Sequence, residues 1–336
     1  VYATAQFELP NPAIVQAEPE SQGIEIEIVE SAHRLLLQGD GISYAFDRST
    51  GLLSSIRRYS EEWMIRPLAP NFWRAPTDND FGNYMQDWAA VWEQAGRNRD
   101  LHLFDFVKLE NGEVKVSAEY VFSDEQGNEL GRWIATYRMS EEGQLHVANE
   151  FTRKEGLPVM PRVGMNMELS AKLDQVRWFG RGPHENYWDR KRSARIGIYD
   201  SSVAELYVPY MRPQENGYRT DTRYVVFSDG YSGLQVEADD VIGFSALHNR
   251  MEDFIPPVKI AITSEDGPGA RDNEQRVNIH VSDIKPRDLV SINIDYGQMG
   301  VGGDDSWGKR TLPQYTLSEP SYRYGFVIRP WVNNKR

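Results

Sequence analysis

The stretch Ile42-Ser-Tyr-Ala-Phe46, followed at once by Asp47-Arg-Ser-Thr-Gly51, decides the fold class of this 336-residue chain. Apolar side chains at every second position share one face of an extended strand, and the Asp, Ser and Gly residues after it favour a tight turn. The same alternation recurs in residues 24–28, 114–118, 277–281, 292–294 and 322–326. Turn pairs separate these runs at Asn111-Gly112, Glu142-Gly143 and Asp229-Gly230. The pattern predicts an all-β protein, built as a large antiparallel β-sandwich.

One helix is expected in residues 84–95, and Gly96 offers a C-terminal stop for it. The apolar positions of this segment recur at helical spacing and are Trp88, Val91, Trp92 and Ala95. A repeat of about 20–50 residues, as in solenoids and propellers, is absent from the sequence. We therefore expect a sandwich with one or a few short helices.

The beginning of the chain differs from the rest. Residues 1–9 are typical of a single apolar strand, and the polar, proline-containing segment that follows is typical of a linker. A lone strand is not a domain. We expect residues 1–23 to be the last strand of a preceding domain with its linker, in a longer gene product, and residues 24–336 to form the main domain.

The charge balance narrows the classes of partner. The chain has 37 basic and 50 acidic residues, a net charge of -13, which would repel nucleic acid and anionic membranes. It contains no cysteine, so disulfides and thiolate sites are excluded, and no apolar run approaches the roughly 20 residues of a membrane helix. Nine Trp and 17 Tyr suit neutral, hydroxyl-rich ligands. We expect a soluble, carbohydrate-binding protein whose compartment the sequence does not define.

The loop Met299-Gly-Val-Gly-Gly-Asp-Asp-Ser-Trp307 ends in a large flat aromatic. Its glycines, Gly303 among them, permit positive-φ turns, and Asp304, Asp305 and Ser306 can bond neighbouring backbone amides. Trp307 so held could stack on a sugar face. The alternative is a buried anchor for the loop, because Trp is usually well buried.

Two segments resemble ligand motifs without matching them. The run from Gly303 to Lys309 fits a phosphate-binding loop, but Arg310 stands where a magnesium-binding Ser or Thr is needed. The run Asp78-Asn-Asp-Phe-Gly82 begins like a calcium loop and lacks its later ligands. We interpret the fuller segment from Phe72 to Asp80 as a structural turn in which carboxylates and Asn bond backbone amides and Arg74. A sugar contact from Asn79 or Asp80 is the alternative.

His184 and Glu185 are the ingredients of acid–base chemistry, but strand neighbours point to opposite faces. A structural network with Asp189, Arg190 and Arg181 is the alternative to a joint catalytic role. The cluster from Glu215 to Arg223 is polar enough to bind sugar and equally suited to fixing loops. Serine-hydrolase and zinc motifs are missing, and sequence alone cannot choose a glycosidase carboxylate pair.

Four motifs together resemble the carboxy-terminal region of bacterial β-galactosidases of glycoside hydrolase family 2. They are Arg74-Ala-Pro-Thr-Asp-Asn-Asp80, Gly182-Pro-His-Glu-Asn-Tyr187, Glu215-Asn-Gly217 and Gly302-Gly-Asp-Asp-Ser-Trp307. The resemblance covers about residues 24–330. It implies a galactose mutarotase-like supersandwich, with residues 1–9 closing a preceding immunoglobulin-like domain.

The resemblance also implies a division of labour. The two catalytic glutamates of a retaining enzyme, with their Mg²⁺ and Na⁺ sites, would lie in an upstream barrel domain, so that this chain holds neither catalytic residues nor cofactors. Trp307 would reach into the active site and contact the β-galactoside. The barrel and other domains of the same enzyme, and further copies in a homo-oligomer, are the implied partners. The chain departs from several relatives at Leu312 and Trp188.

Two other functions remain open from sequence. An aldose 1-epimerase-like enzyme could use His184 with Glu185 or Glu215 as base and acid, on a shared fold. A non-catalytic carbohydrate-binding module would use the same loops only for binding or support.

Overall fold

The computed structural model describes residues 5–7, 25–96, 98–255, 280–305 and 308–333. Seventeen strands, four short α-helices and three 3-10 helices lie within these residues. The strands are β1 (Glu27–Glu30), β2 (Arg34–Gly39), β3 (Ile42–Asp47), β4 (Leu53–Arg58), β5 (Glu61–Glu62), β6 (Met64–Asn71), β7 (Arg99–Lys108), β8 (Val114–Ser123), β9 (Glu129–Met139), β10 (Leu145–Arg153), β11 (Arg162–Leu169), β12 (Gln175–Gly182), β13 (Arg195–Ser202), β14 (Arg219–Ser228), β15 (Ser232–Leu247), β16 (Val290–Gln298) and β17 (Ser321–Val332). The helices are α1 (Asp78–Gly82), α2 (Met85–Trp88), α3 (Ala90–Ala95), α4 (Val203–Leu206), η1 (Met251–Phe254), η2 (Val281–Asp283) and η3 (Pro313–Tyr315).

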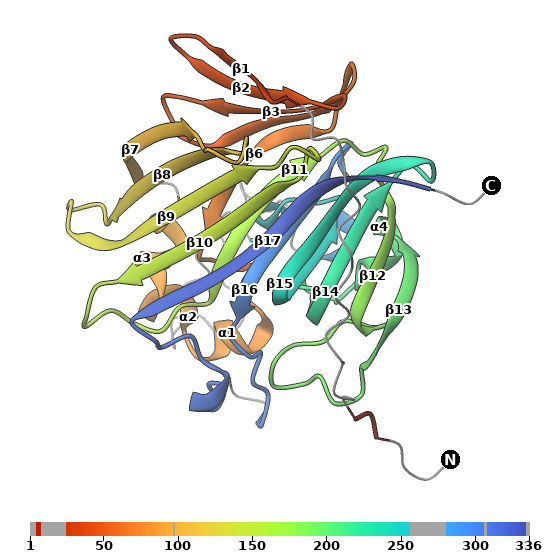
Figure 1. Ribbon diagram of the computed structural model, residues 1–336. Helices are drawn as coiled ribbons and strands as arrows, with labels where there is room; N and C mark the ends of the chain where they lie inside the picture. The colour runs from red at the N-terminus through yellow and green to blue at the C-terminus, as the bar shows by residue number, and fades with distance from the viewer. Residues whose placement is uncertain (1–4, 8–24, 97, 256–279, 306–307, 334–336) are drawn as a thin grey trace.

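Every strand pairing in the described part of the chain is antiparallel, which confirms the predicted class. One layer runs through β1, β2, β3, β4, β6, β11 and β16. The other runs through β7, β8, β9, β10 and β17. The long strand β15 joins them, because residues 232–238 pair with β17 and residues 243–247 pair with β16. Strands β14, β12 and β13 continue from β15 toward the right of Figure 1.

The hydrophobic core lies between the two layers. Along β8, buried and half-buried residues alternate over all ten positions, as the period of a strand requires. The ring of Phe46 on β3 meets the edge of Tyr137 on β9 at 4.9 Å between centroids, so the layers pack directly on each other. A second aromatic group near the helices joins Phe72 to Phe122 and Phe151, at 5.0 and 4.7 Å.

The predicted turns are where the sequence placed them. The turns of the hairpins β3–β4, β7–β8, β9–β10 and β14–β15 each contain a glycine with positive φ, between 68° and 94°. These glycines are Gly51, Gly112, Gly143 and Gly230. A Cβ at Gly143 would lie 2.7 Å from the side chain of Ile42, so this position also lacks room for a larger residue.

The prediction of one continuous helix over residues 84–95 is wrong, because the segment contains two short helices. Tyr84, just before α2, has a left-handed backbone with φ of 62°. Ala89 leaves the helical region and separates α2 from α3. The two indoles of the segment have different partners. Trp88 Nε1 donates to Asn83 Oδ1 at 3.0 Å, whereas Trp92 Nε1 donates to Pro158 O at 3.0 Å. The bond of Trp92 joins residues 66 positions apart, and tertiary contacts of this kind override a local helical preference.

Three other expectations concern segments that the structure describes only in part. Residues 277 and 279 of the predicted strand 277–281 lie outside the described residues, and Val281 begins the 3-10 helix η2 rather than ending a strand. Of the expected strand 1–9 only residues 5–7 are described, and they carry no strand. Gln6 nevertheless uses both atoms of its side-chain amide to pair with the backbone of Ile196 on β13, at 2.8 Å each. The division at residue 23 stays a prediction.

No helix within the described ranges combines the length and the apolar character that a membrane crossing would require.

Candidate functional site

The predicted loops converge at one end of the sandwich, beside α1 (Figure 1, lower part). They enclose an open cleft of about 410 Å³. Its lining comes from α1 and its cap, from the segments around residues 187–190 and 210–215, and from the loop after β16. The lining residues are Thr77, Asp78, Asn79, Tyr187, Arg190, Tyr210, Gln214, Glu215, Val301, Gly302 and Gly303.

Arg74 is the fixed point of this end. It follows β6, is fully buried, and forms a two-point ion pair with Asp80 at 2.9 and 2.8 Å. Asp80 in turn closes a capping box with Thr77, which starts α1. The interpretation of this segment as a structural turn built on Arg74 is therefore confirmed. A buried guanidinium paired in this way orders the loops that it touches.

The loop after β16 is held at four consecutive residues. Arg74 donates to the carbonyl oxygens of Met299 and Gly300, at 2.7 and 3.1 Å. Asn79 Nδ2 donates to Val301 O at 3.0 Å, and the amide of Gly302 donates to Asp189 Oδ2 at 2.7 Å. Every one of these contacts comes from a segment distant in sequence. Backbone bonds from Met299 N to Pro161 O and from Gly300 N to Tyr315 O add to these contacts, so the path of residues 299–302 is set by surrounding segments rather than by local turn preference.

Beyond residue 302 the loop reaches solvent. Gly303 has a φ of 103°, and Asp304 and Asp305 are exposed. Asp305 Oδ1 accepts from the amide of Lys309 at 3.1 Å, which is the kind of backbone contact predicted for it. Ser306 and Trp307 lie outside the described residues, so the stacking role of Trp307 stays a prediction.

His184 and Glu185 have different hydrogen-bonding partners in the structure. His184 Nε2 lies 3.0 Å from Ser193 Oγ and the residue is exposed. Glu185 binds Arg190 and the hydroxyl of Tyr210, and it accepts from the amide of Gly217 at 2.8 Å.

The remaining members of the predicted network have separate tasks. Arg181 pairs with Asp221, a partner that the sequence did not indicate, and Asp189 holds the loop at Gly302. The Glu185–Arg190 pair is the part of the expected network that the structure contains.

Glu215 belongs to a buried hydrogen-bond network of charged and amide side chains. It accepts from Arg162 Nη2 at 3.0 Å and from Gln298 Nε2 at 3.1 Å. Arg162 also donates to Asp295 at 2.8 Å, and Gln298 Oε1 accepts from Arg74 at 3.0 Å. This network connects the core between the layers to the loop that Arg74 holds in place.

Arg162 is the cation in that network that pairs with two carboxylates, Glu215 and Asp295. Burial raises the pKa of Asp295 to about 7; Arg162 opposes the rise, and the negative charge of Glu215 adds to it. Sequence reasoning missed Arg162, Asp295 and Gln298. The alternation of the strand gave no signal for Asp295, because it falls on the same face as Ser291 and Asn293, which the pattern assigns to the polar side.

The cleft offers hydrogen-bonding groups from several side chains. Glu185 and Glu215 already accept bonds from cations and amide donors, and the tyrosine, arginine and amide groups of the lining suit the hydroxyls of a neutral ligand. Among the described residues, no three His, Asp or Glu side chains lie close enough together to hold a metal ion.

Comparisons with known proteins agree on a family. The family model described as "Beta galactosidase small chain" matches residues 38–328. A beta-galactosidase of Priestia megaterium is 30% identical over 98% of this chain, and one of Alteromonas mediterranea is 31% identical over 98%. One of Vibrio cholerae is 30% identical over 89%. These matches cover only 29%, 31% and 27% of the relatives, so the chain spans about three-tenths of their length.

Among solved structures, a galactose 1-epimerase from Lactobacillus acidophilus aligns with a TM-score of 0.49 and 10% identity, over 93% of this chain and 100% of that one. The family model, by contrast, extends over most of the described sheet, from β2 to β17. The chain therefore belongs to the beta-galactosidase small chain family.

Proposed function

We propose that this chain is the carboxy-terminal part of a retaining β-galactosidase that hydrolyses terminal β-D-galactosides. Its role is to complete the substrate pocket with Trp307 and to stabilise the enzyme. The catalytic glutamates, with the Mg²⁺ and Na⁺ sites, belong to a part of the complete enzyme outside residues 1–336.

The observation that carries the proposal is the fixation of residues 299–302 by Arg74, Asn79 and Asp189. Such bonds orient a loop at a defined angle to its scaffold, which a binding residue at the loop tip requires. Family membership supplies the class of substrate, and the length of the relatives supplies room for a catalytic region elsewhere. Both glutamates that sequence reasoning singled out have structural partners in this chain.

Trp307 contributes binding rather than chemistry in this proposal. Aromatic stacking adds about 0.5–1.5 kcal/mol beyond area burial, and about 1.4 kcal/mol is tenfold in affinity. Trp307→Ala in the complete enzyme should therefore raise KM by up to about tenfold and lower kcat less. The matched control is Trp331→Ala, because Trp331 is only partly buried and does not line the cleft.

Two measurements decide the proposal. Steady-state hydrolysis of a chromogenic β-galactoside by the complete enzyme and by Trp307→Ala gives kcat and KM separately, and an unchanged KM would remove Trp307 from the pocket. The isolated chain should hydrolyse nothing. A rate from residues 1–336 alone comparable with that of the complete enzyme would contradict the assignment of the glutamates elsewhere.

A further inference from the structure

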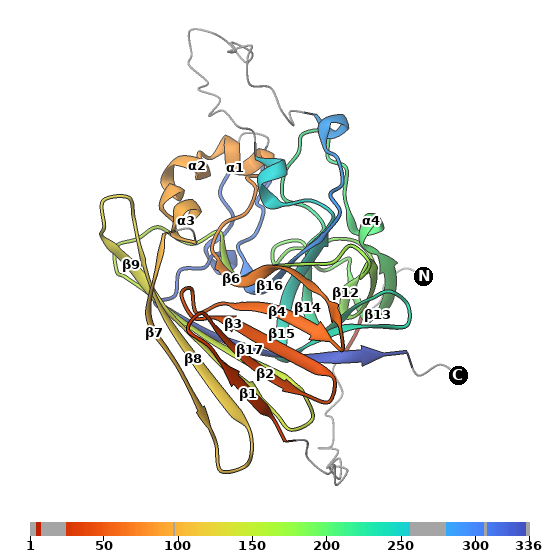
Figure 2. The same ribbon diagram turned by 90° about the horizontal axis from the view of Figure 1, so that it is seen from above.

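Strand β13 forms an open edge of the sheet, on the side of the molecule opposite β7 and β8 (Figure 2). Among the described residues it pairs only with β12. The side-chain amide of Gln6 donates to Ile196 O and accepts from Ile196 N, at 2.8 Å each, as the backbone of a neighbouring strand would. Alternate residues of a strand point their backbone groups to the same edge, so Ile198 and Asp200 present theirs beside the same contact.

An apolar row crosses the outer face of the sheet at this edge. Ile198 on β13 is opposite Phe179 on β12, which is opposite Tyr224 on β14. The rings of Phe179 and Tyr224 are 6.0 Å apart between centroids. Ile198 is 62% exposed, and Phe7, the neighbour of Gln6 in sequence, is 86% exposed. Contiguous apolar side chains of this kind mark an interaction surface.

Charged pairs border this row on both sides. Arg177, two residues before Phe179, bonds Asp200 on β13 at 2.6 and 3.0 Å. Arg181, two residues after Phe179, pairs with Asp221. An apolar centre inside a polar rim is the usual arrangement of a protein–protein interface. Because the charges of the rim are paired within the chain, the surface offers an apolar contact rather than an attraction for an ionic ligand.

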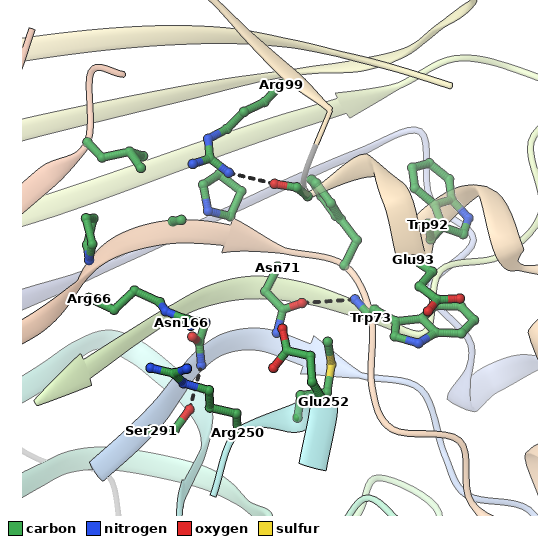
Figure 3. A pocket seen from close by; sticks show the side chains of 17 residues that line it. Arg66, Asn71, Trp73, Trp92, Glu93, Arg99, Asn166, Arg250, Glu252 and Ser291 are labelled. Carbon is green, nitrogen blue, oxygen red and sulfur yellow. Dashed lines mark hydrogen bonds between the residues drawn. The ribbon is translucent and has the colours of Figure 1, made fainter. Parts of the chain in front are cut away.

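The cavity of about 230 Å³ beside β6, β11 and β16 differs from this surface (Figure 3). Polar groups at its walls have partners within the chain: Asn166 donates to Asn293 at 3.1 Å, and Arg250 donates to the fully buried Glu168 at 2.7 and 2.9 Å. Such pairing satisfies polar groups without a ligand. The row at β13, by contrast, consists of apolar side chains that only another surface could cover.

The path of the polypeptide indicates which partner lies there. Five residues precede Gln6 in the sequence, and a segment of five residues spans at most about 18 Å. Any region joined to the chain before Val1 therefore begins within about 18 Å of the contact between Gln6 and Ile196. A separate copy of the chain or an unrelated protein has no such tether to this edge.

We propose that the region of the complete enzyme that precedes Val1 packs against the open edge of β13 and covers the apolar row of Ile198, Phe179 and Tyr224. The inference rests on the proposed function, because the longer enzyme supplies this region. The chain spans about three-tenths of the length of its relatives, which leaves a large remainder to provide the partner. Covering β13 would also remove an edge that can pair with other chains.

Hydroxyl-radical labelling, read for each residue by mass spectrometry, measures side-chain exposure without any substitution. In residues 1–336 alone Phe7 and Ile198 should be labelled readily, as their exposure predicts. In the complete enzyme we expect their labelling to fall at least about fivefold, because the centre of an interface excludes water. Tyr59, which is 76% exposed on the turn between β4 and β5, is the control and should be labelled equally in both.

Ile198→Asp in the complete enzyme tests the row directly. A charge there would be costly to bury, so the labelling of Phe7 and Phe179 should rise to within about twofold of its level in residues 1–336 alone. Val107→Asp is the matched control, because Val107 is 49% exposed on the edge strand β7, on the opposite side of the molecule (Figure 2). It should leave the labelling of Phe7 unchanged.

Equal labelling of Phe7 and Ile198 in the complete enzyme and in residues 1–336 alone would overturn the proposal. Protection that disappears on dilution would overturn it as well, since a second copy would then cover the row. Hydrolysis of a β-galactoside is measured in the same samples. An active enzyme with an unprotected row refutes the docking surface alone, whereas a protected row in an inactive protein refutes the β-galactosidase proposal and supports the docking surface.

Discussion

Arg162 and its two carboxylates show how a single residue can couple the stability of this protein to pH. The guanidinium bonds Asp295 at 2.8 Å and Glu215 at 3.0 Å, and all three groups are buried. One positive charge cannot fully compensate two negative ones in a medium of low dielectric constant. Asp295 holds its proton more tightly chiefly because it is fully buried, and the negative charge of Glu215 adds to this effect while Arg162 opposes it.

The first prediction concerns Asp295→Asn. The pKa of Asp295 is about 7 in the folded chain against an ordinary 3.8, so below pH 4 its contribution to stability is fully present. As the pH rises from about 4 to about 7 the folded state must release a proton that the unfolded state has already lost, and stability falls. The shift corresponds to about 4 kcal/mol at 1.36 kcal/mol per pH unit. The variant cannot titrate at this position and should not show this loss.

Urea unfolding of both proteins between pH 4 and pH 8 measures the effect as a difference in unfolding free energy, which cancels other titrating groups. The control is Asp200→Asn, since Asp200 forms an exposed pair with Arg177 and should change stability by less than about 1 kcal/mol. Parallel curves for wild type and Asp295→Asn would show that Asp295 keeps an ordinary pKa.

At the scale of elements, the segment after β16 and helix α1 depend on close backbone contact. Gly308 has a φ of 90°, and a Cβ there would lie 2.2 Å from the carbonyl carbon of Gly82 at the end of α1. Gly308→Ala therefore combines left-handed strain with a backbone clash and should cost about 2–5 kcal/mol of unfolding free energy. Chemical unfolding of the variant measures this cost.

Gly127→Ala is the matched control for that experiment. Gly127 has a similar φ of 83° with nothing within 4 Å of its Cβ position, so it reports left-handed strain alone, about 1–2 kcal/mol. Equal losses in the two variants would mean that the segment moves away from α1 without cost.

Most strands were predictable because they obey a local rule, although residues 5–7 and Val281, which belonged to two expected strands, lie in none. Alternation and turn residues, as in Ile42 to Phe46 with Gly51, depend only on neighbours in sequence, and the structure follows them. The break between α2 and α3 was not predictable, because the partner of Trp92 is Pro158, 66 residues away. A helical period gives no information about such a contact.

The same difference between local and long-range contacts decides how much of the candidate site was predictable. The pairing of Arg74 with Asp80 was predictable because both belong to one short motif. Their connection to residues 299–302, and the chain from Gln298 through Glu215 to Arg162, joins segments up to 226 residues apart. Only the packing of the two layers brings them together. Polar residues such as Asn166 and Asn293 were missed because a strand pattern read for apolar positions treats them as outward-facing.

At the scale of the whole molecule, one core joins both layers. Strand β15 belongs to both, because its first half pairs with β17 and its second half with β16. Most buried apolar residues of these strands form one continuous cluster in the described part of the chain, and Leu247 at the end of β15 belongs to a second, small one. The layers should therefore unfold together and not as separate units, although their strands are far apart in sequence.

Phe46→Ala tests this coupling. Phe46 lies on β3 but packs against Tyr137 on β9, so its removal leaves a cavity between the layers and should cost about 3–5 kcal/mol. Hydrogen exchange under conditions where global opening dominates should show the same loss of protection in β3 and in β9. Ile198→Ala, on the edge strand β13 where Ile198 is 62% exposed, should change neither. Loss of protection confined to β3 and its neighbours would show two layers that open independently, and the loops near α1 would then have to be stabilised by one layer alone.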